Sequence, residues 1–419
     1  MRELFSLDMK DYDPGWKRFV RPSVRAVIIR GEKVVMVYSR KFNYYKFPGG
    51  GIEPGETMEQ ALIRETREEA GLEIVPSSIR PFGYVPRLQR DSYQDGLVFC
   101  QDNYYFLCEV TENTFAQKLD GYEADEGFTP VTVDPVEAMS INRCEPHDPK
   151  DPIMTEREAH VLEILLREGY FFQSDEGEEG EKSVFLCSAP EKWNEPALHE
   201  ENDFIPRLMR RTGNRVRFLY VASSPADAEA CDKYSAQVKA AFENSGFEMI
   251  SFALLDDRTA HKAGELVANA DLIFLCGGHV PTQNAFFEKI GLRKLLRPFS
   301  GVIVTCSAGT MNSASAVYCP PEEKGEAADR KFRRFLRGLG LTDVMVMPHY
   351  QDNKDSTVDG LRLYEDITAP DSMGRKITVL CDGSYILKEK GIQTLYGEAY
   401  LMKDGVMTPL CRDGESVVL

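Results

Sequence analysis

The stretch GGIEPGETMEQALIRETREEAGL, residues 50–72, decides the fold of the first part of the chain. Thr57 and Gln60 stand at the spacing of a capping box, which starts a helix, and Gly71 suits the left-handed position that ends one. The stretch therefore predicts a helix over residues 57–70.

Three carboxylates share one face of this helix. Successive residues are about 100° apart, so Glu65, Glu68 and Glu69 continue its apolar side. Grouped carboxylates repel one another and lose hydration unless a cation neutralises them. Hard carboxylate oxygens select Mg²⁺ or Mn²⁺, so the pattern predicts a divalent metal site with these three residues as ligands. Arg64 lies four residues before Glu68 and is predicted to hold its carboxylate.

The loop before the helix, FPGGGIEPG, is rich in glycine. At Gly50 and Gly51 the backbone can approach a pyrophosphate closely, so both are candidate substrate-binding positions. Tyr45 could stack on a nucleotide base, although tyrosines in β-hairpins more often pack across strands.

These residues follow the pattern G-x5-E-x7-R-E-U-x-E-E-x-G-U, where U is aliphatic, and the N-terminal part therefore resembles the Nudix hydrolases. The matching positions are Gly50, Glu56, Arg64, Glu65, Glu68, Glu69, Gly71 and Leu72. Thr66 stands where the family prefers an aliphatic residue. The resemblance implies cleavage of a nucleoside diphosphate linked to another group, with Glu68 and Arg64 in the catalytic step. We call this motif, residues 50–72, the Nudix box. The resemblance also implies a further acid from outside the box, and Glu126 or Glu123 in GYEADEG is the candidate.

Length and charge restrict the class of protein. A chain of 419 residues is long enough for two or three domains. The net charge of −17, from 50 basic and 67 acidic residues, argues against a general affinity for nucleic acid or anionic membranes. The ten cysteines show no metal-binding spacing, and no apolar stretch approaches the length of a membrane span. We therefore expect a cytoplasmic enzyme with small-molecule substrates, and a homo-oligomer is compatible with the sequence.

The first half alternates β-rich runs with helical patterns. Strands are predicted at residues 24–29, 33–38, 103–110 and 128–133. The pair Thr155 and Glu158 has capping-box spacing and predicts the start of a helix that ends near Arg167, with His160 on its surface. Strands flanked by helices favour an α/β/α sandwich with a mixed sheet.

The second half has a different pattern of predicted strands and helices. Its β-rich runs lie at residues 183–187, 216–222, 248–254, 271–276 and 301–305. Alternation with helical patterns predicts a doubly wound, mostly parallel sheet. The acidic run SDEGEEGE has no residues with which to build a core. We therefore predict a Nudix-like domain at residues 1–173, an acidic linker at 174–182 and a second α/β domain at 183–419.

Ser307 marks a second candidate site. It lies in GVIVTCSAGTM, where a buried strand should turn sharply into a helix, and this is the setting of a nucleophile elbow. Upstream, another apolar strand ends at Gly277-Gly278, whose backbone could supply an oxyanion-binding N–H. Downstream, a strand ends before His349, which is the candidate general base.

These pieces resemble the dipeptidase E and cyanophycinase family, serine peptidases on a fold related to class I glutamine amidotransferases. The resemblance implies Ser307 as the nucleophile, His349 as the base and an acid between them, for which Glu322 or Glu323 is the candidate. It implies that the backbone after the nucleophile, at Ala308, joins the paired glycines in the oxyanion site. A short peptide would be the substrate.

Two alternatives stay open. Thr305 stands where the family's elbow, G-x-S-A-G, has its first glycine, which favours a C-terminal domain that binds ligands without catalysis. Ser307 would then be only a helix N-cap. The Nudix-like domain could also be a nucleotide sensor that regulates its partner domain.

Overall fold

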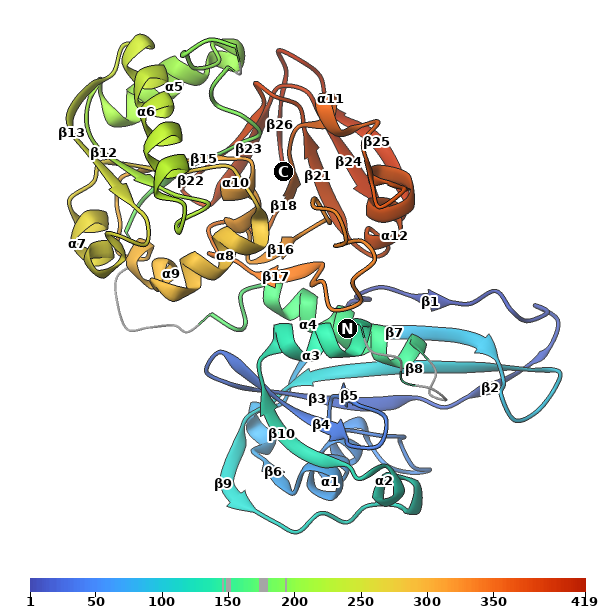
Figure 1. Cartoon of the computed structure of the whole chain (residues 1–419). Helices are drawn as coiled ribbons and strands as arrows, with labels where there is room; N and C mark the ends of the chain where they lie inside the picture. Colours follow the sequence, from blue (N-terminus) through green and yellow to red (C-terminus); the bar gives the residue numbers. More distant parts are fainter. Residues whose placement is uncertain (145–146, 148–151, 173–179, 193) are drawn as a thin grey trace. The chain divides into compact units, whose positions relative to one another are not determined.

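The computed structural model describes residues 1–144, 147, 152–172, 180–192 and 194–419. The chain splits into two compact units, Met1–Gln173 and Ser174–Leu419 (Figure 1). Most of the predicted acidic linker lies outside the described residues. In the described part, every helix is too short or too polar to cross a membrane.

The first unit is built on a mixed sheet with the order β1-β7-β8-β3-β4-β10. β3 (Ser23–Arg30) and β4 (Lys33–Ser39) form the predicted antiparallel hairpin, while β3 runs parallel to β8 (Leu97–Leu107). The remaining strands are β1 (Leu7–Asp8), β2 (Lys17–Val20), β5 (Tyr44–Lys46), β6 (Leu72–Ile74), β7 (Arg80–Arg90), β9 (Val110–Thr114) and β10 (Thr129–Val133). The prediction of a mixed α/β domain is confirmed.

Helix α1 (Met58–Ala70) carries the carboxylates and has the predicted ends. The Thr57 hydroxyl accepts from the Gln60 backbone N–H, the Gln60 side chain accepts from the Thr57 N–H, and Gly71 is left-handed with φ 65°. Ala61 and Leu62 face the core with Val24 on β3. The hydrophobic effect therefore fixes this face against the sheet and leaves the carboxylates along its border.

The last helix of this unit corrects two predictions. The other helices are α2 (Gly121–Glu126), α3 (Pro135–Cys144) and α4 (Pro152–Arg167). α4 begins at Pro152, before the predicted cap, and the Thr155 hydroxyl donates to the Pro152 carbonyl. Glu158 is buried and accepts from Arg157, so it does not cap the helix. His160 is buried against Phe5, with ring centroids 4.0 Å apart, and is not a surface residue.

The second unit is built on a sheet with the order β13-β12-β14-β15-β11-β22-β23-β26. From β13 to β11 all neighbouring strands are parallel. The strands are β11 (Ser183–Cys187), β12 (Arg215–Val221), β13 (Glu248–Leu255), β14 (Leu272–Leu275), β15 (Val302–Cys306), β22 (Tyr385–Glu389), β23 (Ile392–Tyr396) and β26 (Ser416–Val418). The predicted doubly wound, mostly parallel sheet is confirmed, and its first five strands follow the predicted runs.

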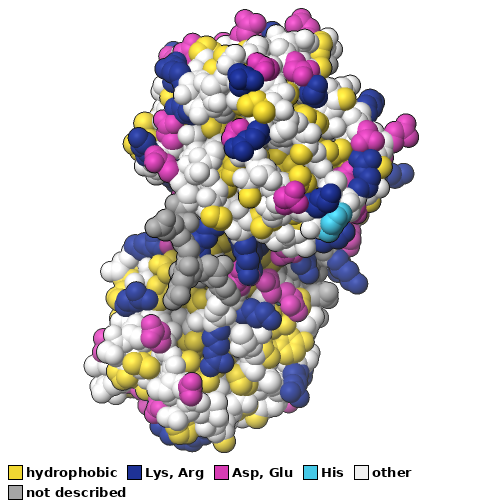
Figure 2. Space-filling view, turned by 90° about the vertical axis from the view of Figure 1, so that its left-hand side faces the viewer, with side chains coloured by type: hydrophobic (Ala, Val, Ile, Leu, Met, Phe, Trp, Pro, Cys, Tyr) yellow, Lys and Arg dark blue, Asp and Glu magenta, His cyan; other side chains and the backbone are white. Residues whose placement is uncertain are grey.

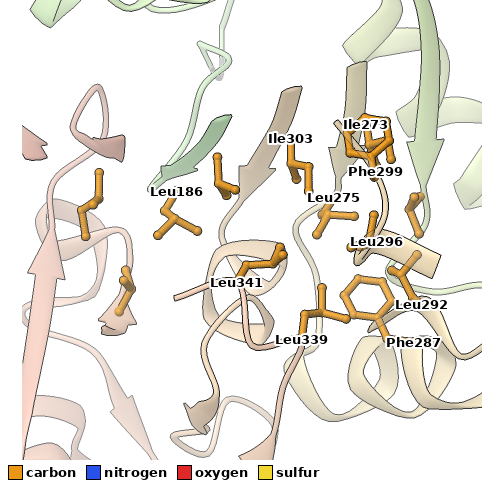
Figure 3. Close-up of a cluster of buried hydrophobic side chains, with 14 of the residues drawn as sticks. Leu186, Ile273, Leu275, Phe287, Leu292, Leu296, Phe299, Ile303, Leu339 and Leu341 are labelled. Atoms are coloured by element: carbon orange, nitrogen blue, oxygen red, sulfur yellow. The ribbon is translucent and has the colours of Figure 1, made fainter. Parts of the chain in front are cut away.

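Helices cover both faces of this sheet. On one face, Leu275 and Ile303 pack against Leu292 and Leu296 of α9 (Figure 3). On the other face, Phe218 and Phe274 belong to a second cluster with residues of α5 and α6. The helices are α5 (Phe204–Thr212), α6 (Ala228–Asn244), α7 (Ala263–Ala268), α8 (Val280–Lys289), α9 (Leu292–Leu296), α10 (Ala308–Asn312), α11 (Tyr350–Asn353) and α12 (Ala369–Asp371).

The C-terminal part adds a second sheet that the sequence pattern did not reveal. β18 (Met345–Met347) runs parallel to β21 (Lys376–Leu380), which continues into antiparallel β24 (Ala399–Lys403) and β25 (Val406–Cys411). The short pairs are β16 (Ala316–Tyr318) with β17 (Phe335–Arg337) and β19 (Thr357–Val358) with β20 (Leu361–Arg362). Basic and acidic side chains are interspersed on the described part of the face in Figure 2.

Two candidate active sites

Arg64 is the centre of the first site. Its Nε donates to Glu56 Oε1 at 2.8 Å, and its Nη2 donates to the Gly51 carbonyl at 3.1 Å. Its Nη1 donates both to Glu65 Oε1, at 2.8 Å, and to Glu68 Oε2, at 3.2 Å. Oxygens of two box carboxylates therefore converge on one cationic nitrogen.

Glu69, the third box carboxylate, has a different partner. It is only 1% exposed and lies 2.5 Å from the Lys46 Nζ, and it also accepts from the Gly49 N–H at 2.9 Å. Burial raises the pKa of this carboxyl to about 7, against the opposing effect of Lys46. Among the described residues, Glu65, Glu68 and Glu69 do not bring three ligand atoms within 4.8 Å of one another.

The two loop glycines lie directly against this cluster. A Cβ added at Gly50 would come within 2.5 Å of the Glu65 carboxyl, so a side chain at this position would have to displace that carboxyl. Gly51 offers its carbonyl to Arg64. The Tyr45 side chain is buried and packs at a tilt against Tyr38, its cross-strand partner, with ring centroids 4.9 Å apart.

The two candidates for the further acid, Glu123 and Glu126, are both buried and have different partners. Glu123 accepts from the Asp120 N–H at 2.9 Å in the capping box of α2. Glu126 is 3% exposed, and its Oε2 accepts from the hydroxyls of Ser39 and Tyr44 at 3.1 and 2.7 Å.

The second site is centred on Ser307, which joins β15 to α10. Its φ of 49° and ψ of −112° are sparsely populated for a residue with a side chain, as expected of an elbow. Its N–H donates to the Ser188 carbonyl at 2.9 Å. At Gly309 a Cβ would meet the Leu275 carbonyl at 2.3 Å, which explains the glycine two residues after the elbow.

Thr305 is accommodated without filling the site. Its buried hydroxyl donates to the Phe185 carbonyl on β11 at 3.1 Å and contacts the Thr310 hydroxyl. Thr310 in turn donates to the Cys187 carbonyl at 2.6 Å. The side chain that replaces the family's glycine therefore ties β15 to β11 and α10.

The acid that meets His349 is Asp382, and neither of the predicted candidates, Glu322 and Glu323, takes this place. The Asp382 Oδ1 lies 2.8 Å from His349 Nδ1 and accepts from the Ser188 hydroxyl at 2.6 Å. Ser188 also accepts from the His349 N–H at 2.8 Å. Asp382 comes soon after β21, the parallel neighbour of the strand that precedes His349, so both residues lie at the same edge of that sheet.

Glu322 and Glu323 lie in an exposed loop instead. Their backbone N–H groups both donate to the Glu326 carboxylate at 2.8 Å. That carboxylate also lies 2.9 Å from Nε2 of His279, the residue after the paired glycines. This loop is therefore held by Glu326 near the end of β14.

A cavity of about 600 Å³ brings the predicted residues together. Ser307, His349, Gly277 and Gly278 all line it. A Cβ added at Gly277 would lie 3.0 Å from the Ser307 Cβ, so the glycine turn lies directly against the elbow. Ala308 follows Ser307 as the first residue of α10.

Sequence reasoning missed three residues of this site, which are Ser188, Glu191 and Asp382. Asp382 carried a readable signal, because it follows the apolar run ITVLC and precedes a glycine, as His349 and Ser307 also follow apolar runs. Ser188 carried the same signal, because it directly follows the apolar run VFLC, whereas Glu191 is one polar residue in an irregular loop.

Two family models match separate parts of the chain. The model of the NUDIX domain matches residues 20–156, and that of peptidase family S51 matches residues 184–391. A nucleoside triphosphatase NudI of Enterobacter sp. (strain 638) is 46% identical over 48 residues, 12% of this chain and 34% of the relative. The same figures hold for the protein of that name from Salmonella schwarzengrund (strain CVM19633). The chain thus spans about a third of the length of the curated relatives that it matches.

Two solved structures are among those that align with parts of the chain. A peptidase from an acI-B1 Actinobacterium has 18% identity and a TM-score of 0.39, over 57% of this chain and 97% of that one. A NUDIX hydrolase from Nitrosomonas europaea has 20% identity and a TM-score of 0.26, over 34% of this chain and 90% of that one.

The Nudix box around Arg64 thus lies in the part of the chain that matches the NUDIX model, and the elbow at Ser307 lies in the part that matches peptidase family S51. The first unit contains a NUDIX domain, and the second contains a domain of peptidase family S51.

Proposed function

We propose that the first unit is a Mg²⁺-dependent hydrolase of nucleoside diphosphates linked to another group. The observation that carries this proposal is the convergence of Glu65 and Glu68 on one cationic nitrogen of Arg64. Two carboxylate oxygens arranged around a positive charge suit a hard divalent cation, so the residues fit the metal that Nudix enzymes use. Glu65 and Glu68 would hold it, and Mn²⁺ could replace Mg²⁺ there.

The chain's own residues would then divide the work. Bound Mg²⁺ would polarise the diphosphate. Glu68, the most exposed of the three box carboxylates, would take the proton of the attacking water. Arg64 would orient the Glu68 carboxylate. The glycine loop would let the diphosphate approach Glu65, while Glu69 would hold Lys46 and the loop backbone in place. Glu126 remains the candidate for the further acid.

A substrate screen tests this proposal. The full chain is incubated with nucleotide sugars, ADP-ribose, dinucleoside polyphosphates and nucleoside triphosphates, the last suggested by the name of the curated relatives. We expect Mg²⁺-dependent release of a nucleoside monophosphate or other phosphate product and its loss with a chelator. Tight nucleotide binding without turnover of any substrate would instead favour the sensor function.

We propose that the second unit is a serine peptidase for short peptides. The cavity that Ser307 and His349 both line supports this proposal, together with the contact between His349 Nδ1 and Asp382. Ser307 Oγ would attack the scissile carbonyl and pass its proton to His349 Nε2. The imidazolium then gives this proton to the leaving amine. Water attacks the acyl-enzyme and gives a proton to His349 Nε2, which returns it to Ser307 Oγ as the acid product leaves. N–H groups of Gly278 and Ala308 would bind the oxyanion.

A fluorophosphonate probe separates this proposal from a catalytically inactive binding module. We expect the probe to label Ser307 in the full chain, and a panel of dipeptides and tripeptides to be hydrolysed. Chelation should leave both results unchanged, because no metal takes part in this mechanism. Absence of both labelling and hydrolysis would favour the binding module.

A further inference from the structure

Glu191 contributes an unexpected carboxylate to the wall of the serine cavity. It lies in the loop after β11 and lines the same cavity as Ser307 and His349. The loop is fixed independently of this side chain, because Glu191 forms a backbone bridge with Leu198 and the His199 N–H donates to the Pro190 carbonyl at 2.9 Å. The carboxylate is therefore held at the cavity before any ligand binds.

This carboxylate lacks a cationic partner among the described residues. Its Oε2 is shielded from solvent and accepts no hydrogen bond there. The neighbouring cation of the cavity wall, Lys192, lies 4.0 Å from Glu195 instead. Burial is the largest cause that raises the pKa of Glu191, to about 7, with Asp382 adding to it and the Cys306 thiol and His349 opposing it. A buried acceptor without a donor costs free energy, so this position favours a ligand that supplies one.

We propose that Glu191 selects peptides with a cationic group beside the scissile bond. This inference rests on the proposed peptidase function of the second unit. An ammonium or guanidinium group offers both the missing donor and the opposite charge. The peptide's α-ammonium and the side chain of a lysine or arginine share this chemistry. A cavity of about 600 Å³ accommodates either group in a short peptide.

Four matched substrates distinguish the two sources of charge. Lysyl-alanine carries both ammonium groups, norleucyl-alanine only the α-ammonium, N-acetyl-lysyl-alanine only the side-chain ammonium, and N-acetyl-norleucyl-alanine neither. With the full chain we expect kcat/KM to be at least about tenfold higher for a peptide with the recognised ammonium than for the uncharged one. Glu191→Gln should reduce this ratio to near one, with labelling of Ser307 by fluorophosphonate retained. Glu201→Gln is the matched control and should keep the ratio. The wild-type Glu201 carboxylate lies 3.0 Å from His199 Nδ1.

A ratio near one in the wild-type chain, or a ratio that survives Glu191→Gln, would overturn the inference. Binding separates this failure from failure of the peptidase proposal. In the Ser307→Ala chain, which cannot turn over, calorimetry should find tighter binding of the charged peptides, and the added Glu191→Gln change should remove the difference. If no peptide is hydrolysed, a charge-dependent difference of this kind still supports the acidic subsite, and its absence overturns it.

Discussion

The two sites hold their acidic side chains with different kinds of partner. Around α1, one guanidinium holds Glu56, Glu65 and Glu68, all within a short stretch of chain. At the elbow, Asp382 is held by a hydroxyl and an imidazole from two distant segments. The first arrangement concentrates charge that a cation can take over. The second orients one imidazole at a cavity that Ser307 also lines, and such an arrangement suits proton transfer.

The largest effect should come from removing the nucleophile. Ser307→Ala is expected to lower peptide hydrolysis by at least about 10⁴-fold, because the attacking oxygen is lost. Nucleotide hydrolysis should not change. Both activities are measured on the same preparation, with the exposed Ser300→Ala as the matched control. Peptide hydrolysis that persists in Ser307→Ala would contradict the role of Ser307 as the nucleophile. The comparison of two catalytic sites would then fail.

The next effect should separate Asp382 from Glu322. Asp382→Asn should lower kcat for peptides by about 10³- to 10⁴-fold, because the ring loses the carboxylate that orients it and stabilises its charge. Glu322→Gln should lower it far less, since Asp382 meets Nδ1. Steady-state kinetics on the two variants provide the measurement. Equal losses would return Glu322 to the role of the acid.

On the Nudix side, Glu68→Gln should lower nucleotide hydrolysis by about 100-fold, because a metal ligand and proton acceptor is lost. Glu59→Gln, an exposed glutamate on the same helix, is the control and should retain full activity. Arg64→Ala should have a milder effect than Glu68→Gln, since it orients ligands without being one. An unchanged rate in Glu68→Gln would contradict the metal assignment.

A smaller effect concerns stability. Thr66 is fully buried, and its hydroxyl has no hydrogen-bond partner among the described residues. Thr66→Val keeps the shape and removes the cost of the buried hydroxyl, about 1 kcal/mol, so the Tm of the first unit should rise by roughly 2–4 °C in calorimetry. Thr155→Val, which removes a hydroxyl that bonds the Pro152 carbonyl, should lower it. If Thr66→Val lowers the Tm, the hydroxyl has a stabilising contact after all.

The smallest change in activity should follow cleavage between the units. The sequence at residues 174–182 is rich in glutamate and glycine, so limited proteolysis should cut there first and yield two stable fragments. Each fragment should retain its own activity to within about twofold if the sites are independent. First cleavage elsewhere would refute the boundary, and loss of either activity on cleavage would indicate that the units communicate.

Local chemistry was readable from the sequence. Thr57, Gln60 and Gly71 lie within one helix length, so capping rules sufficed to predict α1. Arg64 and Glu68 are neighbours on a helix surface, and their contact follows from a spacing of four residues. The hairpin of β3 and β4 and the alternation of strands in the second half likewise depend on patterns of short range.

Tertiary structure decided the partners that come from distant segments. Lys46 reaches Glu69 because β5 pairs beside β4, and Asp382 reaches His349 because β21 pairs with β18. Periodicity reports which face of an element is apolar, but it does not report which strands become neighbours. The sequence alone therefore predicted the two classes of site and their candidate residues Ser307 and the carboxylates of α1, whereas the pairing of strands decided that Asp382 meets His349.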